Sequence, residues 1–235
     1  MRRILLVTCL LFLSIHGFSQ EKTLYFSQAI SANLEKYEEK ANMAYRHNNI
    51  ERADFLFDSL VNHCLKGSYL DNFRVHNLKK KEVFLNEFEK PVYLRTYASW
   101  LVPTEGEVPA LNELAKEYNN EIQIVVLFWD RHETTKELAK KYHKNIVVLY
   151  VDELQNDSSG VIRTMKHSLG FPTTFLLNRD KKIIDIRRSL SHPYGINREE
   201  SFKMNYDSIS DGISLLLLND SNQLNPDEGL ASKPQ

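Results

Sequence analysis

The sequence contains very little cysteine. Only two cysteines occur in 235 residues, Cys9 and Cys64, and Cys9 lies in an apolar N-terminal segment. If that segment is removed on export, the mature chain has one thiol and cannot form an internal disulfide. Thiol–disulfide exchange needs a second thiol to resolve the mixed disulfide, so we expect no self-contained dithiol activity.

The sequence also lacks an excess of positive charge. It has 30 Lys and Arg against 31 Asp and Glu, for a formal net charge of −1, whereas a nucleic-acid-binding domain normally shows a basic stripe. The histidines show no metal-ligand spacing, and no phosphate-binding loop or nucleophile elbow occurs. We therefore expect no nucleic-acid partner, no metal and no cofactor.

The N-terminal apolar run is short. It extends from Ile4 to Ile15, less than the roughly 20 residues that a transmembrane helix needs. Two arginines precede it and small or polar residues follow it, which is the order of a secretory signal. We predict that residues 1–19 are a signal peptide and that the protein is exported to the periplasm or cell envelope, with no transmembrane segment in the mature chain.

The first pattern in the sequence after this segment is a helical periodicity of apolar residues. Apolar residues recur at steps of three and four from Phe26 to Ala44 and again from Ala53 to Leu65, which predicts a helical extension over residues 21–66. Cys64 lies on the apolar face of the second helix, where cysteine acts as a small hydrophobe. The alternative is a redox partnership with a cysteine of another protein.

The rest of the chain alternates strand and helix patterns. The apolar run from Ile122 to Trp129 is typical of a strand buried on both faces of a parallel sheet. The alternation predicts one α/β domain over residues 67–217, and the polar segment 218–235 is predicted to be disordered. Predicted strands are 73–78, 82–85, 91–98, 122–129, 146–151, 175–178 and 183–186, and predicted helices are 103–119, 131–143, a short helix ending at His167, and 199–217.

Five short stretches of this domain carry a family resemblance. In chain order they are residues 71–78, Lys90-Pro91-Val92-Tyr93-Leu94, Ala98-Ser99-Trp100, Glu107-Val108-Pro109-Ala110-Leu111 and Gly170-Phe171-Pro172-Thr173-Thr174-Phe175-Leu176. Together they resemble the thioredoxin domain of the exported TlpA/ResA-like thiol–disulfide oxidoreductases, over residues 67–190. The resemblance implies a thioredoxin-like fold, with a central mixed β-sheet flanked by helices, here preceded by the helical extension.

The resemblance also marks a former redox loop. Its residues are Trp100, Leu101, Val102, Pro103, Thr104 and Glu107. The family's two cysteines fall on Leu101 and Thr104, and neither side chain can form the thiolate that disulfide exchange requires. Glu107 matches a carboxylate that assists thiol ionisation in the family. We therefore assign no catalytic residue and lean against enzymatic activity.

Two local structures are possible at this loop. Thr104 and Glu107 have the spacing of a capping box, whereas Pro103 suits a first helical position, which would move the cap one residue earlier. Pro109 is expected to kink the helix in either case. Without thiols, Glu107 is expected to act as a cap or as a partner of the helix dipole.

The candidate binding groove faces this loop. Its residues are Phe171, Pro172 and Thr173, and the resemblance implies a cis peptide bond before Pro172. In the family, the backbone there pairs with an extended substrate peptide. Phe171 can supply an apolar contact in such a groove, or it can cover Leu101 and close the site, and the sequence does not decide between these.

Three functions fit these residues. The first is a non-catalytic binding or folding-assistance module that holds a protein or peptide partner in the cell envelope. The second is a thiol–disulfide oxidoreductase or antioxidant-type enzyme that acts through Cys64 or by other chemistry. The third is a structural role in which the hairpin at residues 21–66 is the docking surface, because fold alone does not fix function.

Overall fold

The computed structural model describes residues 23–152, 163–170, 172–190, 193 and 195–224. The predicted signal peptide, Phe171 and the last eleven residues of the predicted tail, 225–235, therefore lie outside the described residues.

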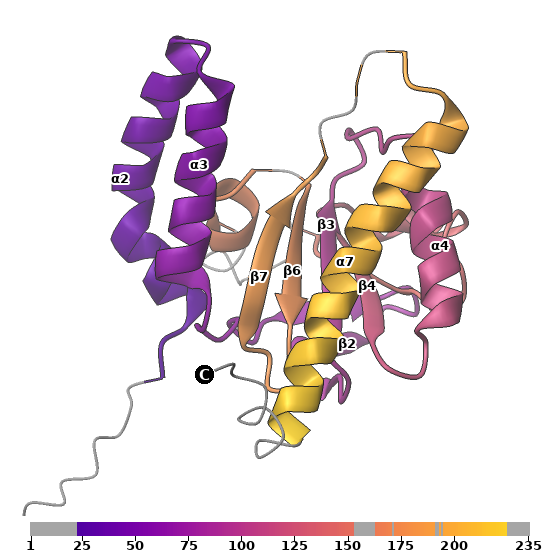
Figure 1. Cartoon of the computed structure of the whole chain (residues 1–235). Helices are drawn as coiled ribbons and strands as arrows, with labels where there is room; N and C mark the ends of the chain where they lie inside the picture. The colour runs from indigo at the N-terminus through magenta and orange to yellow at the C-terminus, as the bar shows by residue number, and fades with distance from the viewer. Residues whose placement is uncertain (1–22, 153–162, 171, 191–192, 194, 225–235) are drawn as a thin grey trace, which may run out of the picture.

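One seven-stranded mixed sheet forms the centre of the molecule, in the order β2-β1-β5-β4-β3-β6-β7 (Figure 1). Strands β3, β4 and β5 run parallel, and the remaining neighbours are antiparallel. This sheet, with helices on its faces, confirms the predicted mixed α/β fold. The strands are β1 (Arg74–Asn77), β2 (Glu82–Phe84), β3 (Val92–Tyr97), β4 (Gln123–Phe128), β5 (Val147–Tyr150), β6 (Thr173–Leu177) and β7 (Ile183–Arg188).

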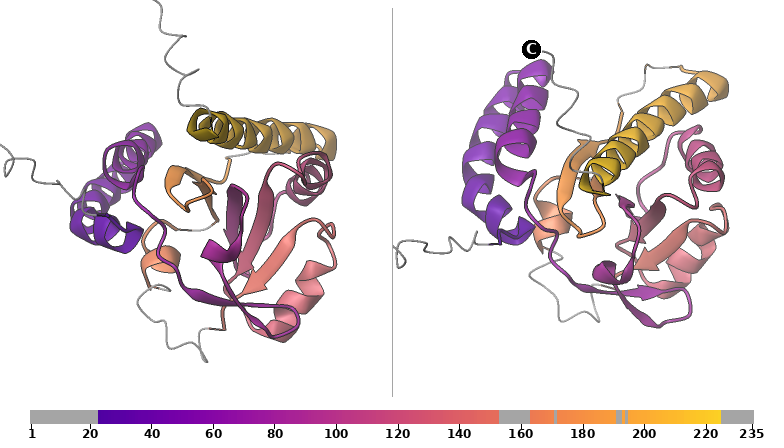
Figure 2. Two further views of the ribbon diagram at one scale, coloured as in Figure 1. Left: turned by 90° about the horizontal axis from the view of Figure 1, so that it is seen from below. Right: turned by 60° about the horizontal axis from the view of Figure 1, so that its bottom comes forward.

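Two layers of helices cover the sheet (Figures 1 and 2). On one face lie α2 (Phe26–Arg46), α3 (Ile50–Leu60), η1 (Val61–Leu65) and η3 (Arg163–His167), and on the other lie α4 (Glu107–Glu117) and α7 (Arg198–Leu224). The short helix η2 (Leu85–Glu87) follows β2, and α5 (His132–Ala139) follows β4. The central strands are buried because both of their faces are covered, and every residue of β3 is buried.

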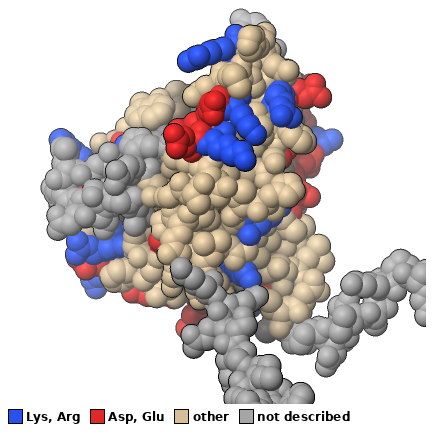
Figure 3. Space-filling model, turned by 90° about the vertical axis from the view of Figure 1, so that its left-hand side faces the viewer, with Lys and Arg blue, Asp and Glu red and all other residues tan. Residues whose placement is uncertain are grey.

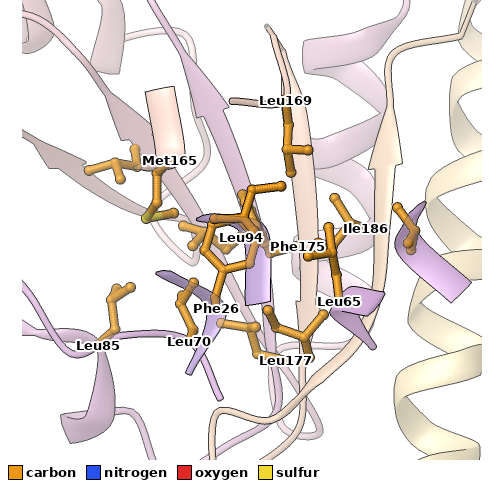
Figure 4. Close-up of a cluster of buried hydrophobic side chains, with 14 of the residues drawn as sticks. Phe26, Leu65, Leu70, Leu85, Leu94, Met165, Leu169, Phe175, Leu177 and Ile186 are labelled. Atoms are coloured by element: carbon orange, nitrogen blue, oxygen red, sulfur yellow. The ribbon is translucent and has the colours of Figure 1, made fainter. Parts of the chain in front are cut away.

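The two faces of the sheet carry separate apolar cores. Successive side chains of a strand point to opposite faces, so Leu94 of β3 joins the core beneath α2, whereas Tyr93 and Tyr97 join the core beneath α4 and α7. Figure 4 shows the first core, where Phe26 and Leu65 from the N-terminal hairpin lie beside Phe175. The Phe26 and Phe175 rings meet edge to face at 5.4 Å. The hairpin therefore contributes a full layer to the core.

Two helix ends differ from the sequence predictions. Helix α4 begins at Glu107 rather than at residue 103, and α7 continues to Leu224, seven residues beyond the predicted end at 217. The prediction of disorder was therefore wrong for residues 218–224. Asp220 explains part of this, because its carboxylate accepts two hydrogen bonds from Arg179 at 2.6 and 2.9 Å in the turn between β6 and β7.

The outer face of the hairpin is unevenly charged. In Figure 3 the charged side chains lie mainly toward the top, near the turn between α2 and α3, and the middle of the visible face is largely uncharged. The sequence agrees, since residues 26–34 carry no charged side chain whereas residues 35–40 are mostly charged. The hairpin as a docking surface stays a prediction, because the described residues do not identify what would cover this face.

Two consecutive arginines at the end of β7 attach both helical layers to the sheet. Arg188 donates to the Tyr37 and Tyr45 hydroxyls of α2 at 2.6 and 3.2 Å, and its guanidinium lies 4.0 Å from the centre of the Phe57 ring. Arg187 points to the opposite face and pairs with Asp211 of α7 at 2.8 Å. Each side chain therefore holds a different layer.

Replacing Arg188 with alanine is expected to loosen the hairpin alone, by about 1–3 kcal/mol for the lost cation–π contact and hydrogen bonds. Amide hydrogen exchange measures this, with protection falling over residues 26–65 and unchanged in α7. Arg187→Ala is the matched control and is expected to give the reverse pattern. Equal loss of protection in both layers for either variant would contradict the separate attachment.

Candidate functional site

The loop 98–106, which contains the predicted loop residues Trp100 to Thr104, lies between the end of β3 and the start of α4. Strands β3 and β4 are parallel neighbours, so their carboxyl ends meet at one edge of the sheet, where α/β proteins commonly bind ligands. Asp130, just after β4, accepts hydrogen bonds from the Ser99 amide at 2.7 Å and the Ser99 hydroxyl at 2.5 Å. The first part of the loop is therefore fixed to the neighbouring strand.

The middle of the loop is exposed. Trp100 is 67% exposed and Val102 92% exposed, while Leu101, Pro103 and Thr104 are half-buried. The structure thus places Trp100 to Thr104 at the surface, whereas Glu107, the sixth predicted loop residue, is buried. Phe171 lies outside the described residues, so whether it covers Leu101 stays open.

Helix α7 holds the end of the loop. The Gly106 amide donates to the Ser201 hydroxyl at 3.1 Å, and the Asn205 side-chain amide donates to the Thr104 hydroxyl at 3.0 Å. Both predicted caps are wrong, because α4 begins at Glu107 after Gly106, with no side-chain cap. Pro109 is the third residue of α4. The N–H groups of the first residues of a helix have no intrahelical acceptor, so the missing N–H of Pro109 gives no reason for a kink.

Glu107 does not cap the helix because its carboxylate is buried in an ion pair. Its Oε1 lies 2.6 Å from an Arg95 guanidinium nitrogen, and the two side chains are each 7% exposed. The Tyr97 hydroxyl donates to the same carboxylate oxygen. A charged pair with several hydrogen bonds is the arrangement in which buried charges are tolerated.

Arg95 is the centre of this cluster. It also donates to the Thr174 hydroxyl of β6 at 2.8 Å and to the Ser189 hydroxyl at 2.5 Å. Within the described residues its Nε is buried without a hydrogen-bond partner. Burial lowers the pKa of Arg95, but the Glu107 carboxylate together with the neighbouring Tyr97 and Tyr93 side chains more than offsets this, so the pKa is raised and the charge is retained.

The cluster also fixes the protonation state of Tyr97. Burial raises the pKa of the Tyr97 hydroxyl well above its usual range, and the Glu107 charge adds to this shift despite the opposing charge of Arg95. Tyr97 therefore stays protonated as a donor to Glu107. Sequence reasoning missed Arg95, although an arginine inside a fully buried strand requires a buried partner.

A cavity of about 360 Å³ opens beside the loop. It lies between the loop, α4, the end of β4 and α5, and three aromatic rings belong to it: Tyr97, Phe128 and Tyr142. Tyr97 and Phe128 stack with ring centres 5.8 Å apart, and Tyr142 meets Phe128 edge-on at 6.1 Å. The other lining residues are Ala98, Ser99, Leu101, Val102, Pro103, Thr104, Glu105, Val108, Leu138 and Lys141.

Pro172 and Thr173, the two predicted groove residues that the structure describes, do not line this cavity. Pro172 is half-buried, and Thr173 is fully buried, with its amide and carbonyl bonded to the Thr96 hydroxyl. Sequence reasoning placed the binding surface on the Pro172 side of the loop and missed the contribution of α5. The cavity lies on the α5 side of the loop, and the groove at Phe171, Pro172 and Thr173 stays a prediction.

Cys64 is remote from this cavity. It is half-buried and packs against the core beneath α2, whereas the cavity rings belong to the core on the opposite face of the sheet.

Among the described residues, no group of three or more His, Cys, Asp or Glu is placed to hold a metal ion. Within the same residues, no helix has the length and apolarity needed to span a membrane.

Comparison with known proteins agrees with this fold. The AhpC/TSA family profile matches residues 67–186, which is more than half of the chain, and the chain belongs to this family. The match begins after the helical hairpin and ends before α7. Together with the sheet order, it confirms the predicted resemblance to thioredoxin-like proteins.

Similar proteins carry thiol–disulfide names. The thiol-disulfide oxidoreductase ResA of Bacillus thuringiensis subsp. konkukian is 31% identical over 121 residues, which are 50% of this chain and 66% of that protein. The ResA of Bacillus anthracis is 30% identical over 122 residues, 51% of this chain and 67% of that protein. In each case about a third of the relative lies outside the match.

Solved structures give a weaker likeness. A thio-disulfide isomerase from Thermus thermophilus has 21% identity and a TM-score of 0.45, covering 63% of this chain and 96% of that chain. A thiol:disulfide interchange protein from Bacteroides sp. has 19% identity and a TM-score of 0.46, covering 62% and 88%.

Proposed function

We propose that the protein is a redox-inactive thioredoxin-like module of the cell envelope, which binds a peptide segment of a protein partner at the loop 98–106. One observation carries the proposal: the loop holds Leu101 and Thr104 in place of a thiol pair, and Glu107 is bound by Arg95. The loop and its supports are retained, while the groups that would do the chemistry are absent or occupied.

Thiol–disulfide exchange is the activity that the names of the relatives state, and it needs a thiolate. Neither Leu101 nor Thr104 can supply one, and Cys64 packs on the opposite face of the sheet. Oxidoreductase activity through Cys64 therefore stays a second, less supported candidate.

Binding is favoured by what the loop exposes. Trp100 and Val102 present apolar surface, and tryptophan is among the residues that contribute most to protein interfaces. The hydrogen bonds that Ser99 donates to Asp130 and that Asn205 donates to Thr104 fix both sides of the loop. A fixed loop loses little conformational entropy on binding.

The cell envelope is proposed from the predicted signal peptide at residues 1–19. N-terminal sequencing of the protein recovered from cells tests this part. A chain that still begins at Met1 in the cytosolic fraction would contradict export.

Purified mature protein is expected to give no reduction of insulin disulfides above the blank, because the loop has no thiol. The Cys64→Ser variant is expected to behave identically, and a ResA protein serves as the positive control. Turnover by the wild type that Cys64→Ser abolishes would establish the oxidoreductase candidate instead.

Binding is tested on an immobilised peptide library. Peptides retained by the wild type are expected to bind the Trp100→Ala variant at least about tenfold more weakly, as for a central interface residue. Phe55→Ala is the matched control, since Phe55 is a 58% exposed aromatic side chain on α3. A library without any binder that depends on Trp100 would overturn the proposed function.

A further inference from the structure

We propose that the cavity between the loop and α5 receives two neighbouring large apolar side chains of the bound segment, at least one of them aromatic. This inference rests on the proposed function, and it states which sequences the module selects. It places the specificity on the α5 side of the loop, away from Pro172.

The size of the cavity requires more than one side chain. Its volume is about 360 Å³, whereas an engineered apolar cavity of about 150 Å³ binds one benzene molecule. A single ring would leave more than half of the space empty, and voids forfeit contacts with the atoms that line them. Two adjacent side chains, such as Trp and Leu, match the volume better.

The lining selects apolar and aromatic groups. The half-buried Tyr142 ring is open to contact beside the small exposed parts of Tyr97 and Phe128, and aromatic rings contact another ring favourably in stacked or edge-on geometry. Aliphatic atoms of Leu101, Val108 and Leu138 complete the walls. Glu105 and Lys141 also line the cavity and carry one charge of each sign, so the site has no preference for a charged segment.

One polar group in the cavity wall is available to a ligand. The Tyr97 hydroxyl is occupied by Glu107, but the Tyr142 hydroxyl has no hydrogen-bond partner within the described part of the chain. Burial raises the pKa of Tyr142, which keeps this hydroxyl protonated as a donor. A backbone carbonyl of the bound segment is the acceptor that fits it.

The exposed loop backbone indicates that the occupant is a peptide. Val102 is 92% exposed, and its amide and carbonyl make no hydrogen bond with any residue in the described ranges. Unpaired backbone beside side-chain pockets is the arrangement by which extended peptides bind, with main-chain bonds for affinity and pockets for specificity. A free small molecule would use the cavity but not this backbone.

Isothermal titration calorimetry with blocked tetrapeptides tests the inference on the mature chain. Acetyl-Ala-Trp-Leu-Ala-amide is expected to bind at least about thirtyfold more tightly than acetyl-Ala-Ala-Ala-Ala-amide, because each large side chain that is buried adds apolar contact. Naphthalene-2-carboxamide, which has two rings and no peptide chain, is expected to bind at least tenfold more weakly than the Trp-Leu peptide. Equal affinity for the peptide and the amide would overturn the assignment to a peptide.

Two variants locate the binding. Leu138→Trp fills the cavity and is expected to weaken the Trp-Leu peptide at least tenfold, whereas Tyr142→Phe removes one hydrogen bond and is expected to weaken it about threefold to tenfold. Leu218→Trp makes the same exchange at a 62% exposed position of α7 and is the control. If Leu138→Trp does not fold, as judged by thermal unfolding, Val108→Phe narrows the cavity from α4.

The outcomes separate the two proposals. Library binders that need Trp100 but lack paired apolar residues, or that bind Leu138→Trp unchanged, overturn the cavity assignment and leave the binding function standing. Absence of any Trp100-dependent binder overturns the binding function and the cavity assignment with it. Loss of affinity in Leu138→Trp, but not in Leu218→Trp, supports both.

Discussion

Replacing Arg95 with methionine is expected to destabilise the protein by about 3–5 kcal/mol, the range for breaking a buried ion pair by removing one partner. Glu107 would remain buried with the Tyr97 hydroxyl as its one side-chain donor among the described residues, and the Thr174 and Ser189 hydroxyls would lose the bond from Arg95. Methionine keeps most of the volume, so the loss reports the uncompensated carboxylate more than a cavity. Urea unfolding of the variant and the wild type measures the difference in the free energy of unfolding.

The double variant Arg95→Met with Glu107→Leu separates the pair from its surroundings. Because apolar replacement of a whole buried ion pair is often neutral or stabilising, it is expected to recover most of the loss. A double-mutant cycle with the single variants gives the coupling energy. Arg74→Met is the control, since the Arg74–Glu82 pair is exposed, and it is expected to change stability little. Equal losses in Arg95→Met and the double variant would contradict the ion-pair explanation.

The order of strands and helices could be predicted from the sequence because it depends on local periodicity. The continuous apolar run of β4 and the two strands of the β6–β7 hairpin lie within two residues of their predicted bounds. The family match supplied the fold. The end of α7 could not be predicted, because it depends on the pairing of Asp220 with Arg179, which is 41 residues away in the chain.

The site was harder to predict for the same reason. Thr104 and Glu107 have the spacing of a capping box, but the buried Arg95, twelve residues before Glu107, takes the carboxylate instead. The cavity depends on Leu138 and Tyr142, at and just beyond the end of α5, meeting the loop, and nothing local to α5 indicates this. At this site, contacts between side chains that the sheet brings together therefore override the structure that the local sequence predicts.

Replacing Gly106 with alanine is expected to cost about 3 kcal/mol or more, because α7 crosses the loop without room for a side chain. An added Cβ would lie 2.1 Å from the Phe202 amide nitrogen and 2.3 Å from the Ser201 carbonyl carbon. Both atoms are backbone, so no side chain can turn away, and the start of α7 must move. Overpacking alone typically costs about 1–3 kcal/mol, and this shift would also break the hydrogen bonds that Gly106 donates to Ser201 and that Asn205 donates to Thr104.

The matched control is Gly67→Ala, which separates crowding from backbone conformation. Gly67 has φ +86° but no neighbouring atom closer than 3.8 Å to an added Cβ, so its cost is the roughly 1–2 kcal/mol of a left-handed alanine. Gly106 needs no left-handed backbone, since its φ is −86°, so the destabilisation by Gly106→Ala comes from contact with α7.

Urea unfolding measures the loss of stability in both variants. Hydrogen exchange is expected to show lost protection in the first turns of α7 for Gly106→Ala only. A smaller loss than for Gly67→Ala would mean that α7 yields easily and does not fix the loop. The expected order makes α7, which lies outside the matched family region, the element that holds the loop 98–106 in place.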